Sequence, residues 1–302
     1  MPLSVVPLQK KLMHKAGFVN IIGKPNVGKS TLMNQLVGVR LSIVTPKAQT
    51  TRHRVMGIIN DPDFQIVYSD TPGILEPKYA LHKAMMSYVN VSLEDADVIL
   101  LVIEAGEKFD VAVYSRFQNM TTPIILIINK IDKIESSERG KIKELWEKEL
   151  KAKNVFSVSA LTGENTELIF PALLNLLPEH PAYFPKDELT NRNERFFASE
   201  IIREKIFFHF SQEIPYCVQV CIDEFRDKEN LLWIRATIFV ERESQKGMVI
   251  GKKGAALKKV GTDSRISLEE FFGKKVFLET HVKVSPNWRQ EREKLRSFSY
   301  LE

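Results

Sequence analysis

The sequence predicts two domains of different class: an α/β domain over residues 17–177 and a smaller α+β domain over residues 194–302. A chain of 302 residues is long enough for about two domains. Short apolar runs alternate with longer amphipathic stretches as far as residue 177, and the order of elements then changes. Three prolines fall within residues 178–185, and proline lacks the N–H that a helix or sheet needs. We therefore assign residues 178–193 to a linker.

In the first domain, the apolar runs are nearly continuous, which is typical of parallel strands covered on both faces. We therefore expect a mainly parallel sheet between layers of helices. The expected strands are residues 17–23, 55–60, 64–69, 98–105, 124–130 and 155–160, and the expected helices are residues 30–37, 81–93, 111–119, 136–150 and 165–176.

In the second domain, the expected order is α-β-β-α-α-β. About 117 residues follow the proline-rich stretch, enough for a core of their own. The expected elements are a helix at 194–210, strands at 215–224 and 231–243 joined by the turn FRDKEN, one or two helices within 254–272, and a strand at 275–284.

Composition excludes several classes of protein. No apolar run approaches the roughly 18 residues that span a bilayer, and the amino terminus has no secretory h-region. Two cysteines make no disulfide framework, so we expect a reducing, cytoplasmic location. Residues 1–16 are interpreted as an amino-terminal extension. Its first dozen residues look dispensable and need not be native, because Met13 could itself be a start.

The positive charge is concentrated near the carboxyl end. The formal net charge is +5, and residues 246–296 alone carry 13 basic and 6 acidic residues. A basic block inside a folded segment indicates a polyanionic partner, and we favour nucleic acid over a membrane surface. The alternative is a solvated lysine-rich face.

A phosphate-binding motif opens the first domain. Residues 23–30 read GKPNVGKS and match G-x-x-x-x-G-K-S, between an expected strand and an expected helix. Glycines let backbone N–H groups surround a phosphate, Lys29 can reach the β- and γ-phosphates, and Ser30 can bind magnesium. The alternative is a chance glycine-rich turn. The predicted phosphate-binding residues are Gly23, Lys24, Pro25, Asn26, Val27, Gly28, Lys29, Ser30 and Thr31.

A second motif, DTPG, follows the expected strand at 64–69. We expect Asp70 to hold magnesium through a water and the Gly73 N–H to face the γ-phosphate. Alone, DTPG is a weak turn signal, but its distance from the phosphate loop favours a functional role. The predicted nucleotide-binding residues here are Asp70, Thr71, Pro72, Gly73 and Ile74.

Two further motifs select the base. NKID ends an expected strand, where ligands of open α/β sheets bind. Asp132 can accept hydrogen bonds from guanine N1–H and its 2-amino group, which adenine cannot supply. Lys130 can lie along the base and Asn129 can brace the neighbouring loops. In Ser159-Ala160-Leu161, we expect a backbone N–H to reach the guanine 6-oxo group. The alternative for NKID is an ordinary strand-end turn.

GKPNVGKS, DTPG, NKID and SAL together resemble the motif set of translation-factor-class GTPases, so the first domain is identified as a P-loop GTPase domain. Residues 49–52, QTTR, look like the corresponding loop of the bacterial Era family, one of the TrmE-Era-EngA-septin-like GTPases. The resemblance implies that a threonine of this loop binds magnesium when GTP is present. We favour Thr51, with Thr50 as the alternative. We interpret Arg52 and Arg54 as solvated loop charges, and the alternative for them is a direct catalytic role.

A nucleic-acid motif lies in the second domain. Residues 251–254 read GKKG, and a G-x-x-G loop between helices is the backbone clamp of KH domains. GxxG alone is weak, but within α-β-β-α-α-β it resembles a type II KH domain. Arginines and a tryptophan in residues 287–298 can stack on bases, although a helix packed on the domain would look similar. The predicted RNA-binding residues are Met248, Ile250, Gly251, Lys252, Lys253, Gly254, Lys258, Trp288 and Arg289.

The resemblance to the Era family covers the chain from residue 17 to its end. It implies a GTP-hydrolysing switch that uses Mg²⁺ with GTP or GDP and binds the single-stranded 3′ end of small-subunit (16S) rRNA. It further implies a role in biogenesis of the 30S ribosomal subunit and weak peripheral association with the inner face of the cell membrane. We expect a monomer. The alternatives are a non-catalytic RNA-binding scaffold with structural GTP and, less favoured, a membrane-trafficking GTPase.

No catalytic residue is assigned. Ras-like enzymes place a water-orienting glutamine after the DxxG glycine, but here that residue is Ile74, which has no polar group. We therefore expect slow unaided hydrolysis. The resemblance makes Asn26 a candidate ligand of K⁺, and the alternative is that Asn26 only accommodates the loop backbone.

Overall fold

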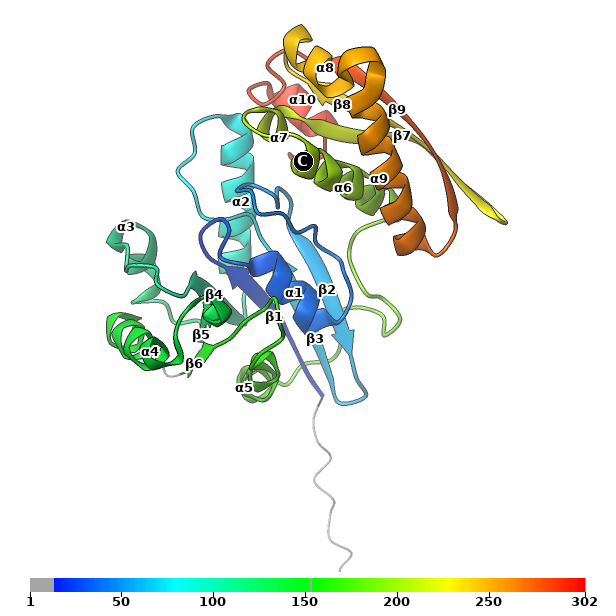
Figure 1. The fold of residues 1–302 in the computed structure, drawn as a ribbon. Coiled ribbons are helices and arrows are strands. Elements are labelled where there is room, and N and C mark those ends of the chain that lie inside the picture. The colour runs from blue at the N-terminus through cyan, green and yellow to red at the C-terminus, as the bar shows by residue number, and fades with distance from the viewer. Residues whose placement is uncertain (1–13, 151, 153, 302) are drawn as a thin grey trace, which may run out of the picture.

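The computed structural model describes residues 14–150, 152 and 154–301, and it confirms a mainly parallel α/β domain followed by a KH-type α+β domain (Figure 1). Residues 1–13 of the expected amino-terminal extension lie outside the described residues. Lys15 and Ala16, which we had placed in the extension, instead begin the first strand.

The first domain is built on a sheet in the order β2-β3-β1-β4-β5-β6. Only β2 runs antiparallel to its neighbour, and the other pairs are parallel. The carboxyl ends of the parallel strands therefore meet at one edge, where the sequence motifs follow β1, β3, β5 and β6. The strands are β1 Lys15–Ile22, β2 Val55–Asn60, β3 Phe64–Asp70, β4 Val98–Glu104, β5 Ile124–Asn129 and β6 Asn154–Ser157.

Helices cover both faces of this sheet, as the continuous apolar strands predict. One face packs against α1 and α5, and the other packs against α2, α3 and α4. Along β4, successive side chains Ile99 and Leu100 enter opposite layers, and both are fully buried. The helices are α1 Lys29–Val37, α2 Ala80–Glu94, α3 Val111–Tyr114, α4 Ser136–Leu150 and α5 Ile169–Leu176, with 3-10 turns at Ser115–Phe117, Ile131–Lys133 and Thr166–Leu168.

In the second domain, β7 pairs antiparallel with β8, and β8 pairs parallel with β9. Helices α6 and α9 supply side chains to the apolar core on one face of this sheet. The elements are α6 Glu194–His209, α7 Ile214–Cys217, β7 Gln219–Lys228, β8 Leu231–Val240, α8 Glu243–Ile250, a 3-10 turn Lys252–Gly254, α9 Ala255–Phe272, β9 Lys275–Val284 and α10 Arg292–Ser297.

The prediction for the first strand of this domain was wrong at both ends. A strand was expected to start at Pro215, but residues 214–217 form the short helix α7. Proline is tolerated in the first turn of a helix, where no backbone N–H is needed. At the other end, β7 continues to Lys228, so most of FRDKEN belongs to the strand.

The linker is tied to the edge strand β2. The Ile58 N–H donates to the Leu189 carbonyl at 2.8 Å, and the Met56 N–H donates to Asn191 Oδ1 at 3.1 Å. These bonds occupy edge N–H groups that would otherwise be free to pair with another strand.

The interpretation of Arg52 and Arg54 as solvated charges was wrong, because only 1% of Arg52 and 7% of Arg54 is exposed. Arg54 is held inside the first domain by the Ser69 hydroxyl and the Asp95 carboxylate. Arg52 instead reaches into the second domain. The local sequence of a polar loop does not show whether other parts of the fold will bury its charged side chains. Composition could therefore not predict the burial of Arg52 or of Arg54.

His53, between these arginines, is buried at the boundary of the two domains. Its ring stacks on Tyr300 at a centroid distance of 4.3 Å and an interplanar angle of 11°. Burial lowers the pKa of His53 from 6.5 to about 3; Glu200 opposes this shift, and nearby arginines add to it. The imidazole is therefore neutral at pH 7.

We expect acid to weaken the fold through His53. The unfolded chain takes up a proton near pH 6.5, whereas the folded chain does so only near pH 3, so stability falls as pH falls through this window. Between pH 7 and pH 5 the loss from this residue should be about 2 kcal/mol of unfolding free energy. Urea unfolding of the parent and His53→Phe, which keeps the ring but cannot titrate, measures it. Equal losses in the two proteins would contradict the prediction.

Candidate nucleotide and RNA sites

The phosphate loop joins β1 to α1, and its backbone requires glycine. Gly28 has a φ of 98°, in the left-handed region. A Cβ there would lie 2.2 Å from the Asn129 side-chain nitrogen, so another residue would displace the base-binding loop. Asn26 also has a positive φ, 66°, a conformation that asparagine tolerates.

Lys29 is buried beneath this loop, and none of the acidic groups that the structure describes lies within bonding distance of it. Its Nζ donates to the carbonyls of Gly23 and Lys24 at 3.1 and 2.8 Å. Burial lowers the pKa of Lys29 to about 8, although Asp70 and Glu107 act in the opposite direction. A phosphate beside this ammonium would offset the cost of burial, as expected of a phosphate-binding lysine.

Three oxygen-bearing side chains from separate elements meet next to Lys29. Ser30 Oγ lies 2.8 Å from Thr51 Oγ1 and donates to Asp70 Oδ2 at 2.6 Å, and Thr51 Oγ1 donates to the same oxygen at 3.2 Å. The Thr50 hydroxyl instead turns to Thr45 Oγ1 and the Lys47 carbonyl. Of the two candidate threonines, Thr51 is therefore the one beside Ser30 and Asp70.

These residues fit a magnesium ion. Asp70 is fully buried, and among the described residues its Oδ1 has no hydrogen-bond partner. Burial raises the pKa of this carboxyl, partly countered by the bond from Ser30. A hard cation takes oxygen ligands and would stabilise the buried carboxylate. Ser30, Thr51 and Asp70 are the residues that would hold it, directly or through water.

The base-binding loops are cross-linked by Asn129. Its Nδ2 donates to the Val27 carbonyl at 2.7 Å, and its Oδ1 accepts from the Ala160 N–H at 2.9 Å. The Ser159 hydroxyl donates to Asp132 Oδ1 at 2.6 Å and so orients that carboxylate. Asp132 is exposed, and a base that covers it must pair with it.

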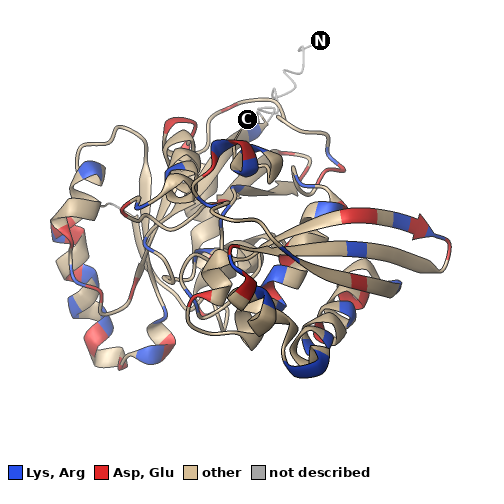
Figure 2. Ribbon diagram, turned by 90° about the horizontal axis from the view of Figure 1, so that it is seen from above, with Lys and Arg blue, Asp and Glu red and all other residues tan. Residues whose placement is uncertain are grey.

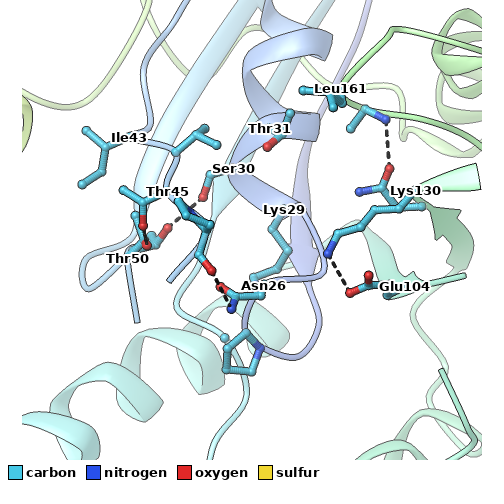
Figure 3. A pocket seen from close by; sticks show the side chains of 18 of the residues that line it. Asn26, Lys29, Ser30, Thr31, Ile43, Thr45, Thr50, Glu104, Lys130 and Leu161 are labelled. Carbon is cyan, nitrogen blue, oxygen red and sulfur yellow. Dashed lines mark hydrogen bonds and ion pairs between the residues drawn. The ribbon is translucent and has the colours of Figure 1, made fainter. Parts of the chain in front are cut away.

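Lys130 pairs with Glu104 at the end of β4, at 2.6 Å (Figure 3). Glu104 lines the same cavity, but no motif contains it, so sequence reasoning missed it. Only the parallel sheet, which ends β4 beside β5, brings this carboxylate to the site.

Most of these groups line one cavity of about 520 Å³, a size suited to a nucleotide, whereas Asp70 and Ser159 lie behind its lining residues. Several predicted residues lie outside it. Lys24 pairs with Glu107 and Asp110 at 3.0 Å, and the Thr71 hydroxyl donates to the Ile21 carbonyl in the core. The predicted residues that line the cavity are Pro25, Asn26, Gly28, Lys29, Ser30, Thr31, Thr50, Thr51, Gly73, Asn129, Lys130, Asp132, Ala160 and Leu161.

The DTPG segment docks onto the phosphate loop. A Cβ on Gly73 would lie 2.5 Å from the Pro25 nitrogen, so only glycine permits this approach. The Ile74 N–H donates to the Gly23 carbonyl at 3.0 Å, and the Ile74 side chain packs against an apolar cluster. Ile74 therefore presents no polar group to a water.

In the second domain, the GKKG loop lies between α8 and α9. Gly251, Lys253 and Gly254 have φ values of 72°, 53° and 78°. A Cβ on Gly251 would lie 2.7 Å from the Ala256 Cβ, whereas one on Gly254 would meet nothing within 4 Å. Gly251 therefore allows the loop to pack closely against Ala256. At Gly254, the space where a side chain would lie is open.

A groove of about 380 Å³ continues from this loop between α9 and β9. Lys258 and Gly254 were predicted from the sequence. Arg265 and Thr280 were not, although residues 258, 261 and 265 share one face of α9 by their three- and four-residue spacing. The lining residues are Gly254, Leu257, Lys258, Gly261, Thr262, Arg265, Leu278 and Thr280.

Lys252 and Lys253 are exposed, and 52% of Met248 is exposed, so their side chains are available to a partner. Ile250 is partly exposed at the end of α8. Acidic and basic residues alternate along α4 and along the β7–β8 hairpin (Figure 2). Basic residues without interspersed acidic residues are therefore found mainly near the GKKG loop. They do not form a uniform basic face.

The structure contradicts the predicted RNA contact of Trp288. This residue is fully buried, and its indole N–H donates to the Cys217 carbonyl at 2.8 Å. It belongs to an apolar cluster with Leu81 and Met85 of α2. Arg289 pairs with Glu241 and lies over the Tyr79 ring, away from the groove. The aromatic-basic pattern here reflects packing between the domains, the alternative weighed above.

Comparisons with known proteins agree with both sites. A family profile described as 50S ribosome-binding GTPase matches residues 18–130, and a KH domain profile matches residues 213–289. GTPase Era of Syntrophus aciditrophicus (strain SB) is 43% identical over 296 residues, covering 96% of this chain and 97% of the relative. GTPase Era of Alkaliphilus metalliredigens (strain QYMF) is 40% identical over 294 residues, covering 96% and 100%.

Two solved structures are similar over nearly the whole chain. A variant of Aquifex aeolicus Era bound to GDP and AlF4⁻ has a TM-score of 0.91 at 41% identity, covering 95% of this chain and 100% of that one. Era in complex with MgGDPNP and nucleotides 1506–1542 of 16S ribosomal RNA has a TM-score of 0.90 at 41% identity, covering 96% and 100%. With its phosphate loop, base-binding loops and GKKG groove in their expected places, this chain belongs to the Era family of GTPases.

Proposed function

We propose that this protein is a GTP-hydrolysing switch whose KH domain holds the single-stranded 3′ end of small-subunit (16S) rRNA during biogenesis of the 30S subunit. The observation that carries the proposal is the meeting of Ser30, Thr51 and the buried Asp70 next to a nucleotide-sized cavity that Lys29, Ser30 and Thr51 line. Thr51 lies in a loop that can respond to the γ-phosphate, so the nucleotide state can change the loop.

Each part of GTP has a candidate partner. Asp132 accepts from the guanine N1–H and 2-amino group, and a backbone N–H of residues 159–161 donates to the 6-oxo group. Lys29 and the loop N–H groups hold the phosphates. Bound Mg²⁺ would neutralise charge on the β- and γ-phosphates, which is the main electrostatic need of phosphoryl transfer. The Gly73 N–H is proposed to face the γ-phosphate, which makes the DTPG segment its second sensor.

Hydrolysis needs a group that Ile74 cannot supply, and we propose a bound K⁺ for this role. Asn26 Nδ2 donates to the Pro46 carbonyl at 3.3 Å, and both residues line the cavity (Figure 3). A monovalent cation held there could stabilise charge as an arginine finger does.

If Asn26 helps to hold K⁺, turnover in KCl should exceed turnover in NaCl by about tenfold or more, and Asn26→Ala should lose the difference. Initial rates of phosphate release at matched ionic strength measure it. The same rate in both salts for the parent would remove K⁺ from the proposal, and a preference for K⁺ retained by Asn26→Ala would assign the cation to other residues.

The KH groove is proposed to hold unpaired RNA. Gly251 and Gly254 allow close approach of a sugar-phosphate chain, Lys252, Lys253 and Lys258 meet phosphates, and Met248 and Ile250 contact bases. The relative in complex with nucleotides 1506–1542 of 16S rRNA supports this choice of RNA.

We further propose that the protein acts as a monomer in the cytoplasm, with weak peripheral contact to the inner face of the membrane. Among the described residues, no helix is both long and apolar enough to cross a bilayer.

A phosphate-release assay tests the proposed function against the scaffold alternative. Turnover of GTP is measured alone, with an oligonucleotide of the 16S 3′ end, and with 30S subunits. The proposal expects multiple turnovers, faster with RNA or subunits. Tight GTP binding without turnover under any of the three conditions would favour a scaffold with structural GTP.

A further inference from the structure

The loop that carries Thr51 is held by the KH domain as well as by Asn34, Asn26 and His82 of the first domain. On its amino-terminal side, Glu204 of α6 pairs with Arg40 and accepts from the Val44 N–H at 3.1 Å. The Lys47 ammonium donates to the carbonyls of Phe207 and Phe210 at the end of α6. These contacts join the magnesium-binding loop to a helix more than 150 positions later in the chain.

Both chain neighbours of Thr51 are anchored in the same way. The Thr50 carbonyl accepts from Arg203 of α6 at 2.5 Å. Arg52 donates to the carbonyls of Val218, Pro215 and Tyr216 at 2.7, 2.9 and 3.3 Å. Between these two attachments, the Thr51 hydroxyl points the other way, toward Ser30 and Asp70.

The partners of Arg52 explain why an arginine is needed. Helix α7 has only four residues, so its carbonyls lack the intrahelical donors that a longer helix would supply. One planar guanidinium carries five N–H donors and can reach several carbonyls at once, unlike the ammonium of lysine. Trp288 covers the guanidinium at 5.9 Å from its ring centroid and completes the burial.

We propose that Arg52 is a positioning residue through which the KH domain holds Thr51 in its magnesium-binding place, so that the GTP site is complete only when the two domains are docked. The inference rests on the proposed function, because it takes Thr51 as a magnesium ligand. Groups that orient metal ligands typically change metal affinity about 10- to 100-fold when they are removed. GDP binding, which does not need Thr51, should be independent of this support.

Arg52→Met tests the proposal, with Arg54→Met as its matched control. The control removes an equally buried arginine two positions away, but its partners Ser69, Asp95 and Asn20 all lie in the first domain. The affinities of GDP and of a non-hydrolysable GTP analogue are measured by fluorescence over a range of Mg²⁺ concentrations. Thermal unfolding of each protein reports any general loss of fold.

In Arg52→Met, we expect the Mg²⁺ concentration for half-maximal binding of the analogue to rise about tenfold, with GDP affinity within about twofold of the parent. Arg54→Met should be less stable yet keep the parent's ratio of analogue to GDP affinity. Arg52→Lys, which retains the charge but reaches fewer carbonyls, should lie between Arg52→Met and the parent. A merely structural role of Arg52 would weaken both nucleotides together.

A variant on the other side of the interface provides a second test. Trp288→Leu uncovers the Arg52 guanidinium without replacing any residue of the first domain, although it also removes packing against α2, and it should shift the Mg²⁺ dependence in the same direction, by about threefold. If Arg52→Met and Trp288→Leu both keep the parent's Mg²⁺ dependence, the positioning role is overturned while the proposed GTP switch stands. A parent that shows no Mg²⁺-dependent binding of the analogue would overturn both.

Discussion

Thr51→Ala is expected to lower kcat for GTP hydrolysis by about 100-fold or more, with little loss of GDP affinity. The Thr51 hydroxyl lies 2.8 Å from that of Ser30 and donates to Asp70, and these three residues would hold a magnesium ion that neutralises phosphate charge. On this proposal, the variant loses a ligand that acts only when the γ-phosphate is present. Steady-state phosphate release and GDP titration measure the two effects separately.

Thr50→Ala is the matched control for this prediction. The Thr50 hydroxyl bonds to Thr45 and to the Lys47 carbonyl, so its loss removes bonds within the loop only. We expect kcat to fall less than about fivefold, the equivalent of one net hydrogen bond. If instead Thr50→Ala is the inactive variant and Thr51→Ala retains activity, the assignment of the magnesium ligand must be exchanged.

Gly254→Asp is expected to weaken binding of the 16S 3′-end oligonucleotide about 100-fold without unfolding the domain. The position is open, since a Cβ meets nothing within 4 Å, and its φ of 78° is one that Asp adopts at moderate cost. The carboxylate would then face the RNA phosphates at the mouth of the groove, where like charges cost several kcal/mol.

Gly254→Asn separates charge from backbone strain. Asparagine has nearly the same shape, tolerates the same positive φ, and carries no charge. Its RNA affinity should stay within about fivefold of the parent, as measured by fluorescence anisotropy at constant salt. Crosslinking to total cellular RNA, with GTP or GDP, tests the contact without choosing the RNA. An unchanged crosslink in Gly254→Asp would place RNA binding elsewhere.

Much of the lining of the nucleotide-sized cavity was predictable from the sequence. The phosphate loop and the DTPG and NKID segments each depend on local backbone geometry and on a side chain at a set spacing. Consecutive residues determine both the geometry and the spacing. Glu104 was missed because it reaches the cavity only through the pairing of β4 with β5. The choice between Thr50 and Thr51 was open for a related reason: which hydroxyl faces Asp70 depends on how the whole loop is held.

The RNA side was predictable where the loop itself carries the signal. Gly251–Gly254 lie where the pattern placed them, between two helices. Arg265 and Thr280 line the same groove only because α9 packs beside β9. The sequence around Trp288 is typical of a nucleic-acid contact, yet this residue is buried against α2.

Hydrophobic periodicity and the glycine-containing motifs, which act over a few residues, were enough to specify the two domain classes, the loops that line the nucleotide-sized cavity and the KH loop. The three-dimensional packing alone assigned Arg52, His53 and Trp288 to a boundary between domains. Arg52 meets a carbonyl and a ring more than 150 positions later in the chain, the ring stacked on His53 is equally remote, and the carbonyl bonded by Trp288 lies 71 positions earlier. Every residue type carries a backbone carbonyl, so no local sequence pattern can indicate such a contact.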